Sequence, residues 1–140
     1  MYVRVNDGQF SVTGLYTVNV IDANDPPSIA DQLYINAPEN TLGAFSENLI
    51  VGLDEDNSST PFGTLDYSIS GGSAADMFVL NTSDNVGYLY LLQELDYETT
   101  TTDYSLQVTV RDGGGLTAIS TVSITIQDGN DSPRLVGERV

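Results

Sequence analysis

The sequence predicts an all-β protein, folded as an antiparallel β-sandwich of about seven strands. Short apolar runs alternate with frequent turn signals, and no stretch has the periodicity of a convincing helix. Two runs, 104–111 and 121–126, alternate between apolar and polar side chains, as strands with one buried and one exposed face do. The chain has neither Trp nor Cys, so we expect a sandwich of a different family from that of antibody domains.

The first predicted element is a β-hairpin over residues 1–21. Strands over 2–6 and 15–21 flank a turn at Asp7-Gly8. A lone hairpin is only marginally stable in water. We therefore expect it either to be poorly ordered or to pair with an edge strand of a neighbouring copy.

The other strands follow at short intervals. They are predicted at 32–36, 49–53, 65–70, 77–80, 88–92, 104–111 and 121–126. Turns are predicted at 71–73 and 81–85, where Gly, Ser, Asn and Asp gather. Pro38 follows the first of these strands and cannot donate to a hydrogen-bond ladder, so it favours an edge position for that strand.

An acidic motif that ends in proline occurs twice, each time after a predicted strand. It reads DANDPP at 22–27 and DGNDSP at 128–133, 106 residues later. Upstream, VRVNDG at 3–8 resembles VTVRDG at 108–113. A period near one hundred residues is typical of a chain of whole β domains.

The repeat predicts the domain layout. We expect the C-terminal hairpin of a preceding module at 1–21, a joint at 22–27, a complete module at 28–127, and the start of a second joint at 128–140.

The charge balance excludes several partners. The 140 residues include 20 Asp and Glu but only four Arg and no Lys, which gives a formal net charge of −16. Such a chain repels nucleic acid and anionic membrane surfaces, so we expect neither as a partner. No apolar run approaches the roughly 20 residues of a membrane span, and we expect no membrane insertion of this segment.

Many of the acidic side chains are predicted to gather at the two poles of the sandwich. One pole should hold Asp54, Asp56 and Asp112 beside the first joint, and the other should hold Glu39, Asp96 and Glu98 beside the second. Carboxylates about 4 Å apart repel by roughly 1 kcal/mol in water and about 4 kcal/mol at a surface-like dielectric. A cation bound by oxygens removes that cost. Short Asp and Asn side chains without His or Cys favour calcium over zinc or copper, and magnesium demands a stricter octahedron.

Five motifs occur along the chain in a fixed order. They are the joint motif, PEN at 38–40, DED at 54–56, LDYE at 95–98 and VRDG at 110–113. Together they resemble an extracellular cadherin repeat of the protocadherin or atypical kind, and the resemblance covers nearly all of 28–133. It implies a seven-stranded Greek-key sandwich with immunoglobulin-like topology, with calcium ions, typically three, between consecutive repeats.

The resemblance also implies which oxygens bind the ions. At the first joint they belong to Asn24, Asp25, Asp54, Asp56 and Asp112. At the second they belong to Glu39, Asp96, Glu98, Asn130 and Asp131, with backbone oxygens from Gly129 and Ser132. Two positions depart from the family: Tyr97 stands where arginine is usual, and Phe62 where asparagine is common.

Asn57-Ser58-Ser59 and Asn81-Thr82-Ser83 match the N-glycosylation pattern. Asn57 adjoins the predicted metal loop, so a glycan there would have to point outward. Asn81 is therefore the stronger candidate.

These patterns predict a calcium-binding repeat that stiffens a tandem ectodomain for cell–cell adhesion, on a single-pass cell-surface protein. Its expected partners are adjacent cadherin repeats of the same chain and another cadherin ectodomain. The alternative is a cadherin-like, calcium-ordered β module of a microbial adhesin or carbohydrate-active protein.

We expect no enzymatic activity. The pairs Asp54/Asp56 and Asp96/Glu98 have the residue types of a glycosidase acid and base. However, the chain has no Trp to stack a sugar, and it lacks the His, Cys and Lys of other catalytic schemes.

Overall fold

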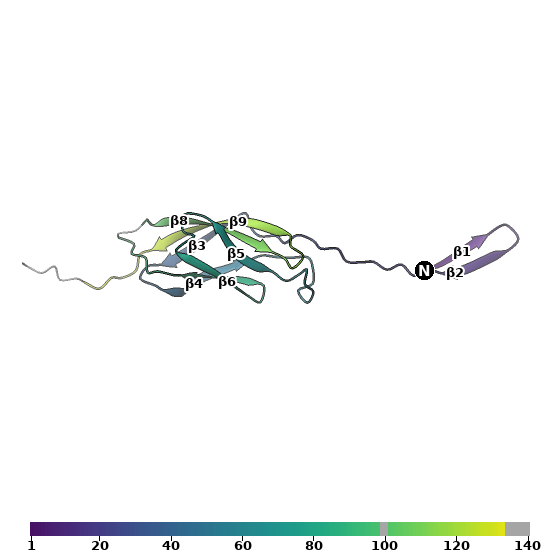
Figure 1. The fold of residues 1–140 in the computed structure, drawn as a ribbon, viewed down its shortest axis with the longest axis horizontal. Helices are drawn as coiled ribbons and strands as arrows, with labels where there is room; N and C mark the ends of the chain where they lie inside the picture. Colours follow the sequence, from purple (N-terminus) through teal and green to yellow (C-terminus); the bar gives the residue numbers. More distant parts are fainter. Residues whose placement is uncertain (99–100, 134–140) are drawn as a thin grey trace, which may run out of the picture.

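The computed structural model describes residues 1–98 and 101–133, apart from the side chains of residues 46 and 47. Throughout this part of the chain the regular structure is β: seven strands form a sandwich and two form a separate hairpin (Figure 1). The predicted fold class is confirmed. Of the second joint, predicted at 128–140, residues 134–140 lie outside the described residues.

One layer of the sandwich is a four-stranded sheet with the order β3-β9-β8-β5. Its strands are β3 (Gln32–Pro38), β5 (Asp66–Gly71), β8 (Asp103–Arg111) and β9 (Thr117–Gln127). Strand β8 pairs antiparallel with both β5 and β9, whereas β3 lies parallel to β9. This one parallel pair departs from the predicted antiparallel arrangement. Because β3 is an edge strand, Pro38 is tolerated at its end, as predicted.

The other layer is a three-stranded antiparallel sheet with the order β4-β7-β6. Its strands are β4 (Gly43–Val51), β6 (Phe78–Ser83) and β7 (Val86–Leu91). The prediction of a strand at 49–53 was wrong at both ends. Strand β4 starts earlier, with an irregular register between Ala44 and Leu49, and Leu53 makes only an isolated bridge to Ser28.

The predicted turn at 81–85 was too long. Strands β6 and β7 are joined by Asp84 and Asn85, both with positive φ (50° and 62°). Asn and Asp accept this backbone conformation more readily than other side chains do, and it suits a two-residue hairpin. The polar residues 81–83 therefore belong to the strand.

The core lies between the two sheets and follows the predicted alternation. In β8 the buried side chains are Leu106, Val108 and Val110, and in β9 they are Val122, Ile124 and Ile126. Ile50 of β4 and Leu89 of β7 close the core from the opposite sheet. The alternating apolar residues of β8 and β9 therefore lie on the same face of their sheet, and this face packs against the other sheet.

A buried tyrosine ties the loops of the sandwich to its core. The backbone N–H of Gly52 donates to Tyr67 Oη at 2.7 Å, and the Tyr67 hydroxyl donates to the carbonyl of Asn85 at 3.0 Å. Burial raises the pKa of Tyr67, and the hydrogen bond from Gly52 offsets part of that rise. Tyr67 thus satisfies the polar groups that the ends of β4 and β6 bring into the interior.

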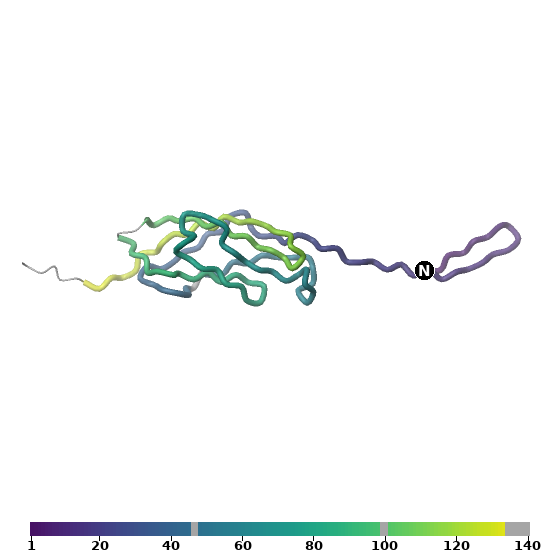
Figure 2. Tube along the Cα trace, viewed as in Figure 1, coloured from purple at the N-terminus to yellow at the C-terminus, as the bar shows by residue number. Residues whose placement is uncertain are grey.

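The N-terminal hairpin stands apart from the sandwich (Figure 2). It consists of β1 (Tyr2–Asn6) and β2 (Ser11–Leu15), and within the described residues neither strand contacts a strand of the sandwich. The predicted second strand, 15–21, was wrong. Met1 and Tyr16 exchange the last hydrogen bonds of the ladder, so the residues after Tyr16 have no partner strand and run on as an extended connection.

Because Leu89 is 0% exposed, we expect its truncation to leave a cavity in the core and to destabilise the protein strongly. Leu89→Ala should lower the free energy of unfolding by about 2–5 kcal/mol, because the removed methyl groups leave an unfilled space. Urea denaturation would measure the change. Leu92→Ala is the control: Leu92 is 56% exposed, and its truncation should cost no more than about 0.5 kcal/mol. Equal losses for both variants would contradict the assigned core.

The isolation of the hairpin predicts weak protection from hydrogen exchange. Amides of β1 and β2 should exchange close to the rate of free peptide, whereas those of β8 and β9 should exchange only through global unfolding. Hydrogen–deuterium exchange followed by NMR or mass spectrometry would compare them. Equal protection of the two regions would show that the hairpin has found a partner strand.

Candidate metal centres at the two poles

The first pole brings the first joint against two loops of the sandwich. Asn24 Nδ2 donates to Asp112 Oδ2 at 2.9 Å, and the N–H of Asp25 donates to Asp56 Oδ2, also at 2.9 Å. The N–H of Asp56 in turn donates to Asp54 Oδ1 at 2.8 Å. All five residues predicted for this pole therefore lie together, although they come from three separate segments.

Two oxygen atoms at this pole are buried without a donor. They are Asn24 Oδ1 and Asp54 Oδ2, and neither accepts a hydrogen bond. The neighbouring side chains of Asp56 and Asp112 are buried as well. A buried acceptor without a partner costs roughly 1–3 kcal/mol, and more when it is charged. The donor set is all oxygen and includes several carboxylates, which is the chemistry that calcium prefers.

Asp112 is held in its ionised form. Burial pushes its pKa upward, but the hydrogen bond from Asn24 and those from the backbone amides of Leu116, Gly115 and Gly114 outweigh burial. The pKa of Asp112 is therefore lower than that of an ordinary aspartate. A negative charge stays at the centre of this pole.

Glycines allow the loops of the first pole to pack closely. A Cβ on Gly63 would lie 2.5 Å from the backbone of Asn57 and of Asp56, and a Cβ on Gly113 would overlap the carbonyl of Pro61. The loop that carries Asp56 is thus folded tightly on itself. Phe62, which departs from the family pattern, is half-buried in the same loop.

Beside the first joint the surface is hollowed. The hollow has a volume of about 530 Å³ and is lined by Asp25, Pro26, Ser28, Leu53, Asp54 and Glu55. Leu53 is exposed on its wall.

The second pole is organised around Glu39, which follows β3 and is buried. Its Oε2 accepts the N–H of Tyr97 at 2.7 Å, and its Oε1 accepts the N–H of Gly129 at 2.6 Å. The carboxylate therefore joins the loop after β7 to the second joint. The substitution of Tyr97 for the usual arginine leaves this backbone contact in place.

The other residues predicted for the second pole lie around Glu39. Asp96 Oδ1 accepts the N–H of Glu98 at 2.9 Å, and Asp131 Oδ1 accepts Asn40 Nδ2 at 2.8 Å. Asn130 and Ser132 are exposed along the same joint.

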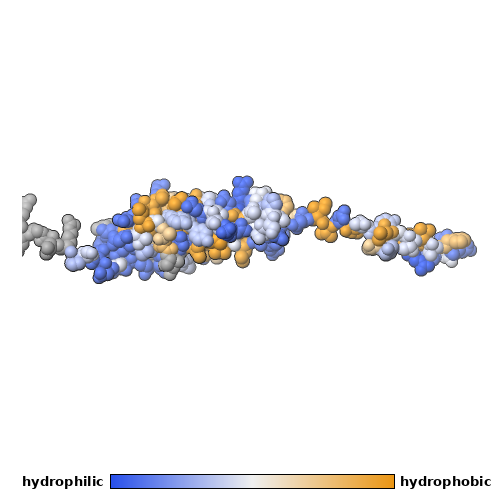
Figure 3. Space-filling view, turned by 90° about the horizontal axis from the view of Figure 1, so that it is seen from below, coloured by the Kyte–Doolittle hydropathy of each residue, from blue (hydrophilic) through white to orange (hydrophobic). Residues whose placement is uncertain are grey.

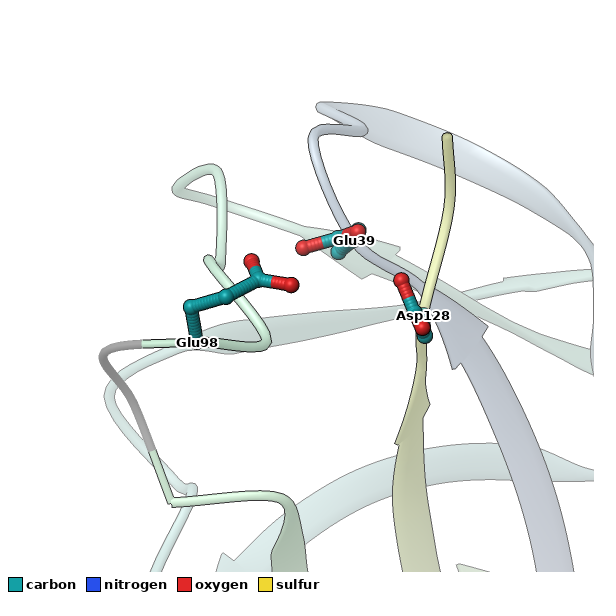
Figure 4. Close-up of side chains that lie close together, drawn as sticks. All are labelled: Glu39, Glu98 and Asp128. Atoms are coloured by element: carbon teal, nitrogen blue, oxygen red, sulfur yellow. The ribbon is translucent and has the colours of Figure 1, made fainter. Parts of the chain in front are cut away.

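Three carboxylates at this pole converge on one point. One oxygen from each of Glu39, Glu98 and Asp128 lies within 4.8 Å of the others, and the side chains point toward one another (Figure 4). Burial raises the pKa of Glu98, and the negative charges of Glu39, Asp131 and Asp128 raise it further. The side chain of Glu98 is therefore harder to ionise than that of an ordinary glutamate.

Asp128 was not among the predicted ligands. It is the first residue of the second joint motif, and the repeat of that motif was the signal that could have found it. Its position directly after β9 aims its side chain at Glu39 rather than along the joint.

No part of residues 1–98 or 101–133 forms a helix with the length and hydropathy that crossing a membrane requires.

The fold and the two poles define a class of protein: a β-sandwich module that the chain enters at one end and leaves at the other, with clustered acidic oxygens at each end (Figure 1). The cadherin domain family matches residues 34–127. The chain belongs to the cadherin family, as the resemblance in its motifs predicted.

Relatives of known sequence agree with this assignment. The chain is 33% identical over 133 residues to protocadherin Fat 2 of Mus musculus, covering 93% of this chain and 3% of the relative. It is 33% identical over 141 residues to cadherin-related family member 1 of Homo sapiens, covering 99% of this chain and 16% of the relative. The chain therefore spans only a small part of these relatives.

Solved structures show the same fold. The human desmocollin-1 ectodomain matches with a TM-score of 0.73 and 27% identity, over 95% of this chain and 28% of that one. The extracellular domain of protocadherin GammaB4 matches with a TM-score of 0.70 and 32% identity, over 87% of this chain and 19% of that one. The chain thus contains a cadherin repeat homologous to those of adhesion cadherins.

The close packing at the first pole predicts that Gly63 tolerates no side chain. Gly63→Ala should destabilise the protein by roughly 1–3 kcal/mol, because the new Cβ would meet backbone atoms that have no room to yield. Urea unfolding would give the free energy, and NMR would follow the Asp25 amide. Gly71→Ala is the control, since its nearest neighbour lies at an ordinary 3.5 Å. A stable Gly63→Ala variant with an unshifted Asp25 amide would contradict the packing of this loop.

Proposed function

We propose that this chain binds calcium at both poles of its sandwich, and that the bound ions hold consecutive cadherin repeats in line within an adhesive ectodomain. The observation that carries the proposal is the pair of buried oxygens without donors, Asn24 Oδ1 and Asp54 Oδ2. They lie in one cluster with the carboxylates of Asp56 and Asp112. A calcium ion with six to eight oxygen ligands would satisfy these oxygens and neutralise the charge.

The second pole supports the same proposal by its charge. Three carboxylates whose oxygens lie within 4.8 Å of one another repel strongly unless a cation or a proton intervenes. We infer that calcium binds here through Glu39, Glu98, Asp96, Asn130 and Asp131, with the backbone oxygens of Gly129 and Ser132 as further ligands. Asp128 adds a carboxylate to this set.

We infer that residues 1–21 are the C-terminal hairpin of a preceding repeat. A shift of 106 residues aligns 11–21 with β9, so that β2 and β9 start at equivalent positions. In that register Tyr16, Val18 and Val20 correspond to residues that are buried in β9, yet all three are exposed here. They have the apolar pattern of a core strand without the sheet that would cover it.

The mechanical role follows from where the ions would sit. Ligands from the first joint and from two loops of the sandwich would be joined through one cation, so the joint could no longer swing freely about the module. Pro26 and Pro27 already restrict the same segment.

The setting of this repeat is proposed from its relatives. Their names describe protocadherins and cadherin-related proteins of animals, and the structural matches are ectodomains. We infer an extracellular location, with adjacent repeats of the same chain and another cadherin ectodomain as partners. This similarity favours the adhesive ectodomain over a microbial or carbohydrate-active module.

The proposal predicts opposite effects of one substitution with and without calcium. Asp54→Asn should weaken calcium binding at least about tenfold, equivalent to about 1.4 kcal/mol, because it removes a charged ligand. In EDTA the same variant should be at least as stable as the parent chain, since it relieves repulsion. Isothermal titration calorimetry would measure binding, and thermal unfolding would measure stability.

The control for this experiment is Asp31→Asn. Asp31 is exposed beside β9 and is held there through its backbone carbonyl, so its substitution removes the same charge away from both poles. It should leave calcium affinity within a factor of two. Calcium at about one hundred times its dissociation constant should stabilise the parent chain by about 2.7 kcal/mol. The absence of both binding heat and stabilisation in the parent chain would refute the proposal.

A further inference from the structure

We propose that Asn81 carries an N-linked glycan whose first sugars cover apolar and aromatic side chains on the outer face of the three-stranded sheet. The inference rests on the extracellular location in the proposed function, because the lipid-linked sugar donor is met in the secretory pathway. It does not depend on calcium. Its first support is the Asn81-Thr82-Ser83 sequence, which has the pattern that N-glycosylation requires.

The second support is the position of Asn81 in the sheet. Asn81 lies on β6, an edge strand, and pairs directly with Tyr88 of β7, which in turn pairs with Leu49 of β4. Directly paired residues point to the same face of a sheet. The side chain of Asn81 is exposed, so a sugar attached to it emerges beside Tyr88 and reaches toward Leu49.

The third support is the composition of that outer face. Its paired rows consist of Ala44, Tyr90 and Val79, then Leu49, Tyr88 and Asn81, then Val51, Val86 and Ser83. These described side chains are all uncharged, in a chain with 20 acidic residues; the side chains of residues 46 and 47 of β4 lie outside the description. Leu49 and Val51 are 51% and 53% exposed. Figure 3 shows hydrophobic surface on the body of the sandwich seen from the side on which β4 and β6 lie.

An uncovered apolar face of this kind marks either a contact surface or a site of aggregation. The sheet itself offers one occupant, since the acceptor Asn81 is on the face. Apolar C–H groups of a sugar ring can lie on the ring of Tyr88, while its hydroxyl groups face the solvent. The glycan would thus supply the polar outer layer that the side chains of this sheet do not.

The covalent step requires a lipid-pyrophosphate oligosaccharide as the donor. The amide nitrogen of Asn81 attacks the anomeric carbon of the first sugar, and a C–N bond forms as the C–O bond to pyrophosphate breaks. The lipid pyrophosphate leaves with the bonding electron pair. The amide nitrogen gives up one proton to the transferase, so that atoms and charge balance.

Asn57 offers a useful contrast. Its Oδ1 accepts the N–H of Ser59 at 2.8 Å, and its carbonyl accepts the N–H of Thr60 at 2.8 Å, in the loop that carries Asp56. It lies beside the first pole and not on the uncharged face. Asn57→Gln removes this sequon, and mapping of the glycan to individual peptides separates Asn81 from the remaining match at Asn130-Asp131-Ser132.

The experiment uses the full chain, secreted from cultured animal cells behind a cleavable signal peptide. Peptide mass spectrometry before and after treatment with peptide N-glycosidase would detect the glycan. In the Asn57→Gln protein we expect a glycan on Asn81, and in both Asn81→Gln and Ser83→Ala we expect its complete loss. Ser83→Ala destroys the sequon while keeping Asn81, so it covers the case in which Asn81→Gln fails to be secreted. An unmodified Asn81 in the secreted Asn57→Gln protein would overturn the inference.

Coverage of the face is tested separately with the apolar dye anilinonaphthalene sulfonate. Ser83→Ala added to Asn57→Gln lacks the glycan on Asn81, and it should bind the dye several-fold more than Asn57→Gln alone, which retains it. Adding Leu49→Ser to Ser83→Ala should reverse most of that increase. Equal dye binding with and without the glycan would refute coverage. Calcium titration of the same secreted protein distinguishes the two proposals. Calcium binding without a glycan would refute this inference alone. A glycan without calcium binding would refute the proposed function alone.

Discussion

The concentration of negative charge at the two ends of the sandwich is the constraint on which the rest of this structure depends. Each end brings carboxylates from distant segments into contact through hydrogen bonds, as between Asp25 and Asp56, or between Glu39 and Gly129. Backbone and amide N–H groups satisfy only some of these oxygens. Asn24 Oδ1 and Asp54 Oδ2 accept no hydrogen bond, and in the proposed function a cation would satisfy them. The two sheets thus cover the hydrophobic core, whereas hydrogen bonds compensate only part of the negative charge at the two ends.

The parallel pairing of β3 with β9 is what places the two acidic ends opposite each other. The first joint leads into β3 and the second follows β9, and because these strands run in the same direction, the chain enters at one end and leaves at the other. An antiparallel pairing of the same two strands would return the chain to its starting end. In the proposed function, repeats linked in this way would extend as a rod, and an ion at each junction would limit the bending of that rod.

Much of this arrangement could be predicted from the sequence, and the failures have identifiable causes. The alternation of apolar and polar residues in β8 and β9 located the core. Because successive strands alternate in direction, the acidic loops were assigned to opposite ends, with Asp54 and Asp112 at one end and Glu39 and Glu98 at the other. The second strand of the hairpin was predicted too late in the sequence because residues 16–20 alternate like a buried core strand. The same alternation is present whether or not a partner strand pairs with these residues. Pattern alone cannot show that the ladder ends where Met1 meets Tyr16.

Other misses came from features that only three-dimensional packing decides. The irregular register of β4 between Ala44 and Leu49 interrupts the period of two, so half of that strand carried no recognisable signal. Asp84 and Asn85 form a tighter turn than their polar neighbours suggested, because the partner strand β7 extends β6 through Ser83. Asp128 sits in a motif that is clear in the sequence, but its direction depends on the last residue of β9.

The two sheets differ in how their outer faces meet water, and this difference separates the functions proposed for them. On β9, Thr121, Ser123 and Thr125 alternate with the buried residues and contribute polar groups to the outer face of the larger sheet, where Ile119 and Tyr34 are also exposed. Among the described side chains, the smaller sheet has mainly tyrosine, leucine and valine on its outer face, with Asn81 and Ser83 as the polar residues of β6. In the proposed function, charge at the ends would fix neighbouring repeats along the chain. The apolar and aromatic side chains on the outer face of the smaller sheet offer no ligands for a cation, and the acceptor Asn81 among them makes an attached glycan the simplest cover for that face.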